Sequence, residues 1–185
     1  MTRTVFVVGG DPSVRIMFHS NAWRSVDDPQ LADFICFTGG ADVSPHLYGE
    51  KNEGLSHCDP KRDDREVAIY HAFFEKPKIG ICRGGQFLNV MSGGKMKQHH
   101  PGHMMGQQRV RTIGPHSKFF TAHEDHHQVI LPTTEGFVFL RAVVDDVVEG
   151  VYYPHTKSFC FQPHPEWGHK ETKDLFFSFL NLYND

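Results

Sequence analysis

The chain has 185 residues and a formal net charge of −3, and its composition is 39% hydrophobic and 12% aromatic, which is enough for a buried core and argues against disorder. This length predicts one domain over residues 1–185, and the weakly negative charge excludes the basic surface of a general nucleic-acid-binding or anionic-membrane-binding protein. No run approaches the roughly 18 apolar residues of a membrane span, and the apolar run near the N-terminus is too short for a secretory signal, so we expect a cytoplasmic protein.

Short apolar runs in the first half of the chain predict buried parallel strands. They are Thr4–Val8, Phe34–Phe37 and Lys78–Ile81, and a pair of adjacent glycines follows each within three residues. Asp64–Glu75 carries apolar residues at close to the helical period and predicts a helix. Phe87–Met91 predicts a second short helix, which the following Ser-Gly-Gly ends.

The second half of the chain predicts strands of a different kind. Phe137–Val144, Val147–Tyr153 and Phe159–Gln162 are rich in β-branched and aromatic residues and predict an antiparallel meander. Lys170–Tyr183 has one apolar face and predicts a C-terminal helix. Together these elements predict an α/β fold with a mainly parallel central sheet and antiparallel strands in the C-terminal half.

Cys82 lies where a predicted strand meets a predicted helix, between Gly80 and Gly84. This is the spacing of a G-x-S-x-G nucleophile elbow, with sulfur in place of oxygen. Such a strained turn needs neighbours without a Cβ atom, and it places the sulfur at a helix N-terminus, where the dipole favours the reactive thiolate. Backbone N–H groups after Cys82 would then face a developing oxyanion. The alternative is a buried structural cysteine with glycines for packing.

A candidate base for this nucleophile lies near the C-terminus. His164 stands between Pro163 and Pro165, whose fixed φ angles restrict the backbone, and Glu166 follows. In an extended segment residues i and i+2 share a side. Glu166 can therefore reach one imidazole nitrogen of His164 while the other faces a thiol, which is the pattern of nucleophile, base and orienting carboxylate.

These two motifs resemble the signature of the class I glutamine amidotransferase superfamily, a G-x-C-x-G-x-Q elbow followed by H-P-E. They stand here as Gly80–Gln86 and His164–Glu166. Within that superfamily the chain is most similar to the γ-glutamyl hydrolase branch, which includes the γ-glutamyl-γ-aminobutyrate hydrolases. The segments that carry this second resemblance are Thr38–Glu50, Arg62–Glu66, Arg83, Leu88–Gly94 and His126–Gln128. Two departures are Pro163, where the family usually has an aromatic residue, and the short stretch between Gly10 and Leu31.

The resemblance implies a class I glutamine amidotransferase-like, flavodoxin-like three-layer sandwich. It implies Cys82 as nucleophile, His164 as general base and acid, and Glu166 as the orienting residue. It also implies an oxyanion hole made by the backbone N–H groups of Arg83 and Gly40. Five residues are implied to contact the substrate: Gly39, Gln86, His126, His127 and Gln128. The resemblance implies no metal and no other cofactor.

The expected activity is cleavage of the γ-amide of glutamine or of a γ-glutamyl amide, through a γ-glutamyl thioester on Cys82. The alternative is a glutaminase subunit that supplies ammonia to a separate synthetase. Arg83 and the Leu-Tyr-Gly-Glu segment favour the first, whereas the short chain leaves the second open. The expected ligand is a small γ-glutamyl compound, and a synthetase or a second copy of the chain stays open as a partner. The intact triad positions argue against an inactive binding module.

The histidines also invite a metal interpretation. His123–His127 matches H-E-x-x-H, but that zinc-protease motif needs a long helix, and here Gln128–Pro132 predicts a strand. The run of His99, His100 and His103 is predicted to be a solvated loop, with metal binding by these histidines as the alternative. Three of the four cysteines are expected to be free and unreactive, with Cys36 and Cys160 in the core and Cys58 in a polar loop.

Overall fold

A mixed sheet of eleven strands runs through the computed structural model, which describes residues 2–167 and 169–184. Its strands are β1 (Thr4–Val7), β2 (Arg24–Ser25), β3 (Phe34–Phe37), β4 (Lys78–Ile81), β5 (Lys95–Lys97), β6 (Gly106–Thr112), β7 (Phe119–Glu124), β8 (Val129–Leu131), β9 (Phe137–Ala142), β10 (Val148–Tyr153) and β11 (Ser158–Phe161). Its α-helices are α1 (Pro12–His19), α2 (Pro60–Ala72), α3 (Arg83–Met91) and α4 (Lys170–Asn184).

The sheet has a parallel half and an antiparallel half that meet at β11. Its strand order is β2-β1-β3-β4-β11-β10-β9-β6-β7, and β8 pairs with both β10 and β5. Strands β2, β1, β3, β4 and β11 run parallel to one another. Strand β10 pairs antiparallel with β11, and β9, β6 and β7 continue the sheet with antiparallel pairing. Every residue of β3, β4 and β11 is buried, as expected for strands covered on both faces.

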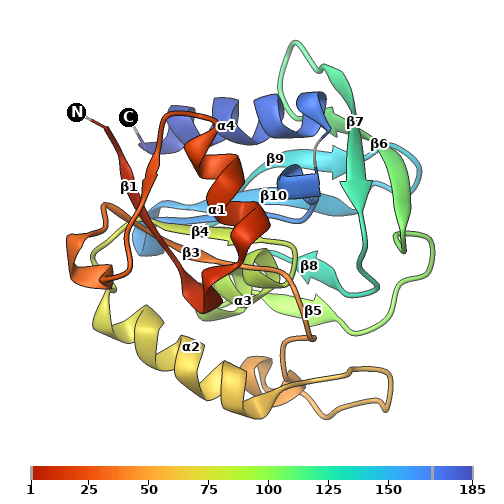
Figure 1. Ribbon diagram of the computed structural model, residues 1–185. Helices are drawn as coiled ribbons and strands as arrows, with labels where there is room; N and C mark the ends of the chain where they lie inside the picture. Colours follow the sequence, from red (N-terminus) through yellow and green to blue (C-terminus); the bar gives the residue numbers. More distant parts are fainter. Residues whose placement is uncertain (1, 168, 185) are drawn as a thin grey trace.

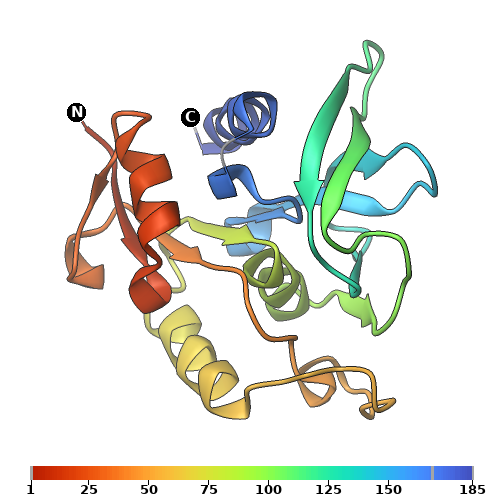
Figure 2. The ribbon, with the colours of Figure 1, turned by 45° about the vertical axis from the view of Figure 1, so that its right-hand side comes forward.

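Helices cover both faces of the parallel half, so the predicted three-layer α/β fold is confirmed. Figure 1 shows α1 and α4 on one face and α2 and α3 on the other. Phe18 and Phe176 belong to the core under the first pair, and Tyr70 and Phe87 to the core under the second. Figure 2 shows β6 and β7 standing beyond the helices, on the side opposite the N-terminal strands. Among the described residues no helix is long and apolar enough to cross a membrane.

The N-terminal region holds an element that the sequence analysis did not predict. Helix α1 begins at Pro12, and the Asp11 carboxylate caps it by accepting hydrogen bonds from the N–H groups of Ser13 and Val14 at 2.9 and 3.1 Å. Asp at the N-cap followed by Pro at the first helical position is a known start signal, so the local sequence contained the evidence.

Helix α2 differs from its prediction in bounds and in the face that it buries. It begins at Pro60 instead of Asp64 and ends at Ala72 instead of Glu75. Its fully buried residues are Asp63, Glu66 and Tyr70, whereas the apolar Phe74 just beyond its end is 42% exposed. Two of the three are acidic because they face a buried arginine of the neighbouring helix α3.

Candidate active site

Cys82 occupies a strained turn between β4 and α3. Its φ and ψ angles are 51° and −115°, a backbone region that residues with a side chain rarely adopt. Its N–H group donates to the carbonyl of Phe161 at 2.8 Å, which fixes the turn to the end of β11. Its carbonyl accepts from the N–H of Gln86 at 3.1 Å and so begins α3. These bonds hold the sharp turn that the elbow motif predicts.

The two flanking glycines of the elbow are required by close backbone packing. A Cβ atom on Gly80 would overlap the carbonyl of Gly84, and one on Gly84 would overlap the carbonyl of Phe37 in β3. Both obstacles are main-chain atoms, which cannot rotate aside. The G-x-C-x-G spacing therefore reflects how tightly α3 packs against β3 and β4 as it leaves the turn.

His164 lies in the segment after β11, held by its side chain and its backbone. Its Nδ1 lies 2.7 Å from Oε1 of Glu166, and its N–H donates to the carbonyl of His123 at 2.9 Å. The indole of Trp167 stacks on the imidazole, with ring centroids 3.8 Å apart and planes inclined by 6°. The predicted reach of Glu166 to His164 is present, but Glu166 sits in a short 3-10 turn, Pro165–Trp167, and not in extended backbone.

The second ring nitrogen of His164 is directed into the interior near Cys82. Nε2 is buried and has no hydrogen bond of standard geometry among the described residues. A Cβ atom on Gly39 would lie 3.2 Å from Cε1 of His164 and 3.7 Å from Cβ of Cys82, so one glycine is packed against both side chains. Burial lowers the pKa of His164, but the Cys82 thiolate and the Glu166 carboxylate outweigh it and raise the pKa to about 10. The surroundings therefore favour the imidazolium form of His164.

The glycine loop after β3 is held by Arg62 of α2. Its guanidinium donates to the carbonyls of Thr38 and Gly39, both at 2.9 Å, and to the Glu66 carboxylate at 2.7 Å. In a trans peptide the C=O and the following N–H point in opposite directions. The N–H groups of Gly39 and Gly40 are therefore turned away from Arg62. Gly40 also lines the pocket that contains Cys82.

Arg83, directly after Cys82, has a buried side chain with a structural role. Its guanidinium forms ion pairs with Asp63 and Glu66 of α2, and Asp63 also accepts from the N–H of Ser44 at 3.2 Å. Burial, and next the charge of Arg62, lower the pKa of Arg83 to about 10. The side chain thus ties the elbow to α2 and to the loop after β3. Its backbone N–H is in the first turn of α3, where no intrahelical partner exists.

A pocket of about 200 Å³ opens beside Cys82. It is lined by Gly40, Asp42, Cys82, Arg83, Gln86, Met104, Asp125, His126 and His127. Three of the predicted substrate residues, Gln86, His126 and His127, are among them. Gly39 instead packs against His164. The Gln128 side chain donates to Ser56 Oγ at 2.8 Å, away from the pocket lining.

Gln128 nevertheless orders two of the lining residues through its backbone. Its carbonyl accepts from Nε2 of Gln86 at 3.1 Å and from Nδ1 of His126 at 2.9 Å. His127 in turn contacts the Asp42 carboxylate at 3.0 Å. The His126–Gln128 segment therefore forms one wall of the pocket.

Several residues of this site escaped the sequence analysis. Asp42, Met104 and Asp125 line the pocket, and the carbonyl of Asp125 lies 3.8 Å from Sγ of Cys82. Asp42 falls inside the glycine segment that carried the family resemblance, which was a usable signal. Trp167 directly follows His-Pro-Glu, but nothing in the sequence indicated that its ring would lie on His164.

The structure confirms one prediction about the histidine-rich segments and corrects another. His123 and Glu124 end strand β7, so the H-E-x-x-H match lacks the helix that a zinc protease needs, as expected. The prediction of a solvated loop over His99–His103 is wrong for His103. That side chain is buried, and its two ring nitrogens contact Asp145 and Glu149. It was missed because both partners come from β10 and the turn before it, far away in sequence.

One family model matches most of the chain. The model of the family described as Peptidase C26 matches residues 16–166. The glutamine amidotransferase-like protein YvdE of Lactococcus lactis is 34% identical over 157 residues, which cover 74% of this chain and 66% of that one. The carbamoyl phosphate synthase small chain of Pasteurella multocida is 29% identical over 66% of this chain and 34% of its own length. The γ-glutamyl-γ-aminobutyrate hydrolase of Shigella flexneri is 40% identical over 37% of this chain and 27% of its own. The chain thus spans two thirds or less of these relatives.

Solved structures share the fold over nearly the whole chain. A protein of Thermoplasma acidophilum described as one of the subunits of GMP synthase has a TM-score of 0.71 at 20% identity, and the match covers 99% of this chain and 94% of that one. A chain of PurLQS from Thermotoga maritima has a TM-score of 0.69 at 20% identity, with 98% of each chain covered. At this identity the likeness concerns the fold alone.

Proposed function

The chain belongs to the peptidase C26 family, and on that premise we propose that it is a cysteine-dependent amidohydrolase that cleaves the γ-amide bond of a γ-glutamyl amide or of glutamine. The observation that carries the proposal is the arrangement of Cys82, His164 and Glu166. A strained cysteine stands at a helix N-terminus beside a pocket, and a histidine fixed by a carboxylate lies close enough for that cysteine's charge to raise its pKa. This is the arrangement of an activated nucleophile with its base.

The reaction begins when the Cys82 thiolate attacks the γ-carbonyl carbon. The N–H groups of Arg83 and Gly40 face the developing oxyanion, because the first is a free donor of α3 and the second is turned away from Arg62. The His164 imidazolium then protonates the departing amine or ammonia as the C–N bond breaks and a γ-glutamyl thioester remains. His164 next removes a proton from water, which attacks the thioester and releases glutamate and the thiolate.

The pocket has groups suited to the glutamyl part of such a substrate. Asp42 and Asp125 line it and offer carboxylates for an α-ammonium group. Met104 also lines the pocket, and its side chain is 63% exposed. A rim that is open and apolar fits a leaving amine larger than ammonia.

A second candidate is a glutaminase subunit that passes ammonia to a synthetase. The observation in its favour is the likeness to a carbamoyl phosphate synthase small chain over 66% of this chain. That reading predicts the same triad and the same thioester. It differs in requiring a partner protein for full activity and in preferring glutamine over larger γ-glutamyl amides.

The deciding experiment measures glutamate release from glutamine and from a panel of γ-glutamyl amides by the wild type and by Cys82→Ala. Release that depends on Cys82 and is faster for the larger amides supports the hydrolase. Release from glutamine alone favours the glutaminase subunit. Cys160→Ala is the matched control, because that cysteine is fully buried in β11 and has no role in the chemistry. Release that survives in Cys82→Ala would refute both candidates.

A further inference from the structure

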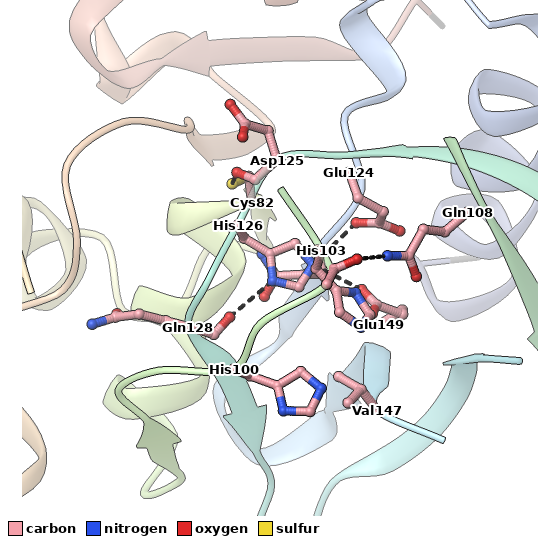
Figure 3. A network of polar contacts seen from close by, with 12 residues as sticks. Cys82, His100, His103, Gln108, Glu124, Asp125, His126, Gln128, Val147 and Glu149 are labelled. Atoms are coloured by element: carbon pink, nitrogen blue, oxygen red, sulfur yellow. Dashed lines mark hydrogen bonds and ion pairs between the residues drawn. The ribbon is translucent and has the colours of Figure 1, made fainter. Parts of the chain in front are cut away.

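A second cluster of ionisable side chains lies behind the pocket wall. His103, Glu124, His126 and Glu149 come from three segments of the chain and converge in the interior (Figure 3). None of the four is more than 5% exposed, and Glu149 is fully buried. Glu149 stands at an irregularity of β10, where the register against β9 shifts between Val148 and Gly150. Such bulges redirect side chains, and this one is directed into the cluster.

The outer nitrogen of each imidazole already has an acceptor. Nε2 of His103 lies 2.9 Å from a carboxylate oxygen of Asp145, and Nδ1 of His126 lies 2.9 Å from the carbonyl of Gln128. Neither acceptor can donate, so both of these nitrogens carry hydrogen. A neutral imidazole has one N–H only. The inner nitrogens, Nδ1 of His103 and Nε2 of His126, therefore each carry a lone pair unless they bind a proton or a metal ion.

The inner nitrogens face two carboxylates, which are acceptors as well. Nδ1 of His103 is 3.2 Å from Oε1 of Glu149, and Nε2 of His126 is 3.2 Å from Glu124 and 3.5 Å from Glu149. Among the described residues, both Glu149 oxygens, one Glu124 oxygen and Nδ1 of His103 lack a hydrogen bond. Buried acceptors that face one another need protons or a metal ion between them. One dication bound by the inner nitrogens and the carboxylates would satisfy all of these groups together.

The two imidazoles lie close together, with the ring centroids of His103 and His126 4.9 Å apart. One dication bound between the rings and the carboxylates would neutralise both carboxylates. Three of the groups converge, because His103, His126 and Glu149 each offer a ligand atom within 4.8 Å of the others. Glu124 lies beside them, 3.2 Å from Nε2 of His126, where it can be the fourth ligand that zinc takes.

We propose that His103, His126, Glu124 and Glu149 form a site for a divalent transition-metal ion, with zinc as the best match. Two imidazoles and two carboxylates suit zinc, whereas magnesium and calcium prefer oxygen ligands alone. Asp145 accepts from the outer nitrogen of His103, as the orienting carboxylate of a metal-bound histidine does. Four protein ligands close the coordination sphere, so the ion is structural.

The position of this site indicates a structural role for the ion at the pocket wall. Glu124 and His126 flank Asp125 in the chain. Asp125 lines the pocket, and its carbonyl oxygen lies 3.8 Å from Sγ of Cys82. His126 lines the pocket as well. An ion bound to both neighbours of Asp125 would fix that wall against the nucleophile. The inference stands apart from the proposed reaction, because metal binding is measured without substrate.

The test is a zinc titration of the EDTA-treated full chain in competition with a chromogenic chelator. We expect one zinc ion per wild-type chain. The zinc affinity should be at least about 100-fold weaker in His103→Gln and Glu124→Gln, and about 10- to 100-fold weaker in Asp145→Asn. His99→Gln is the matched control and should bind as the wild type does, because this exposed histidine contacts only His127 among the neighbouring rings. Binding that is lost in His99→Gln but kept in Glu124→Gln would show an adventitious surface site and overturn the proposal.

A second measurement needs no variant. Cobalt(II) in a closed tetrahedral site absorbs visible light much more strongly than the octahedral aqueous ion, so one equivalent added to the wild type should produce an intense spectrum that zinc abolishes. Zinc should also raise the melting temperature of the wild type but not that of Glu124→Gln. A wild type that takes up no stoichiometric zinc, or gives only the octahedral cobalt spectrum, would leave a shared-proton network as the correct description.

Discussion

The indole of Trp167 lies flat against the imidazole of His164, with ring centroids 3.8 Å apart. One face of the proposed base is therefore covered by a side chain that is itself 46% exposed. The hydrogen bond to Glu166 fixes one ring nitrogen, and the stacking fixes the plane in which the other nitrogen lies. The orientation of the base thus depends on a residue outside the triad.

Removing that contact should impair turnover more than binding. In Trp167→Ala we expect kcat to fall about 10- to 100-fold, because small misplacements of a reacting group carry penalties of this size, while KM changes little. Trp167→Phe keeps a ring on His164 and should retain most of the activity. Steady-state kinetics with the best γ-glutamyl substrate measure both. Equal losses in the two variants would mean that stacking does not position the base.

The pH profile should report the charge on His164. Burial lowers the pKa of this histidine, but the Cys82 thiolate and then Glu166 raise it to about 10. The imidazolium that protonates the leaving amine should therefore persist up to about pH 10, and kcat/KM should fall above that. Cys82→Ala removes the strongest influence that raises the pKa of His164. NMR titration of the His164 imidazole protons in this variant should therefore give a lower pKa. An unchanged value would show that the two groups do not interact.

The contact between Arg62 and the glycine loop predicts a defect in chemistry. Lysine cannot hold the carbonyls of Thr38 and Gly39 together with the Glu66 carboxylate, since it lacks the planar fork of arginine. In Arg62→Lys we expect kcat to drop about 10- to 1000-fold through loss of an oxyanion donor. Arg65→Lys is the control, because Arg65 is exposed on the same helix. Similar kinetics in both variants would contradict a role for the loop in the reaction.

The packing of the elbow predicts a stability defect at Gly84. Gly84→Ala places a Cβ atom on the carbonyl of Phe37, so we expect a loss of free energy of unfolding of about 1–3 kcal/mol or more. Gly106→Ala is the control, because its added Cβ would meet only one atom at 4.0 Å and the φ angle is not positive. Urea denaturation measures both, and an equally stable Gly84→Ala would refute the packing explanation.

Sequence patterns predicted the features that depend on neighbouring residues. Buried strands such as Phe34–Phe37 and Lys78–Ile81 were found to the residue, because fully buried parallel strands are short apolar runs. Helices α1 and α2 show where local signals were overlooked or outweighed. The Asp11-Pro12 start of α1 was overlooked, and the buried face of α2 is set by Arg83 of the next helix and not by its own apolar residues.

The sequence by itself determined the elbow and the family, because an elbow is a local turn whose steric needs are written in Gly80, Cys82 and Gly84. Only the tertiary structure decided which distant groups meet. His103 and Glu149 are 46 residues apart and come together because the fold brings the loop after β5 against the bulge of β10. Contacts of this kind depend on strand order and register, which no single segment encodes.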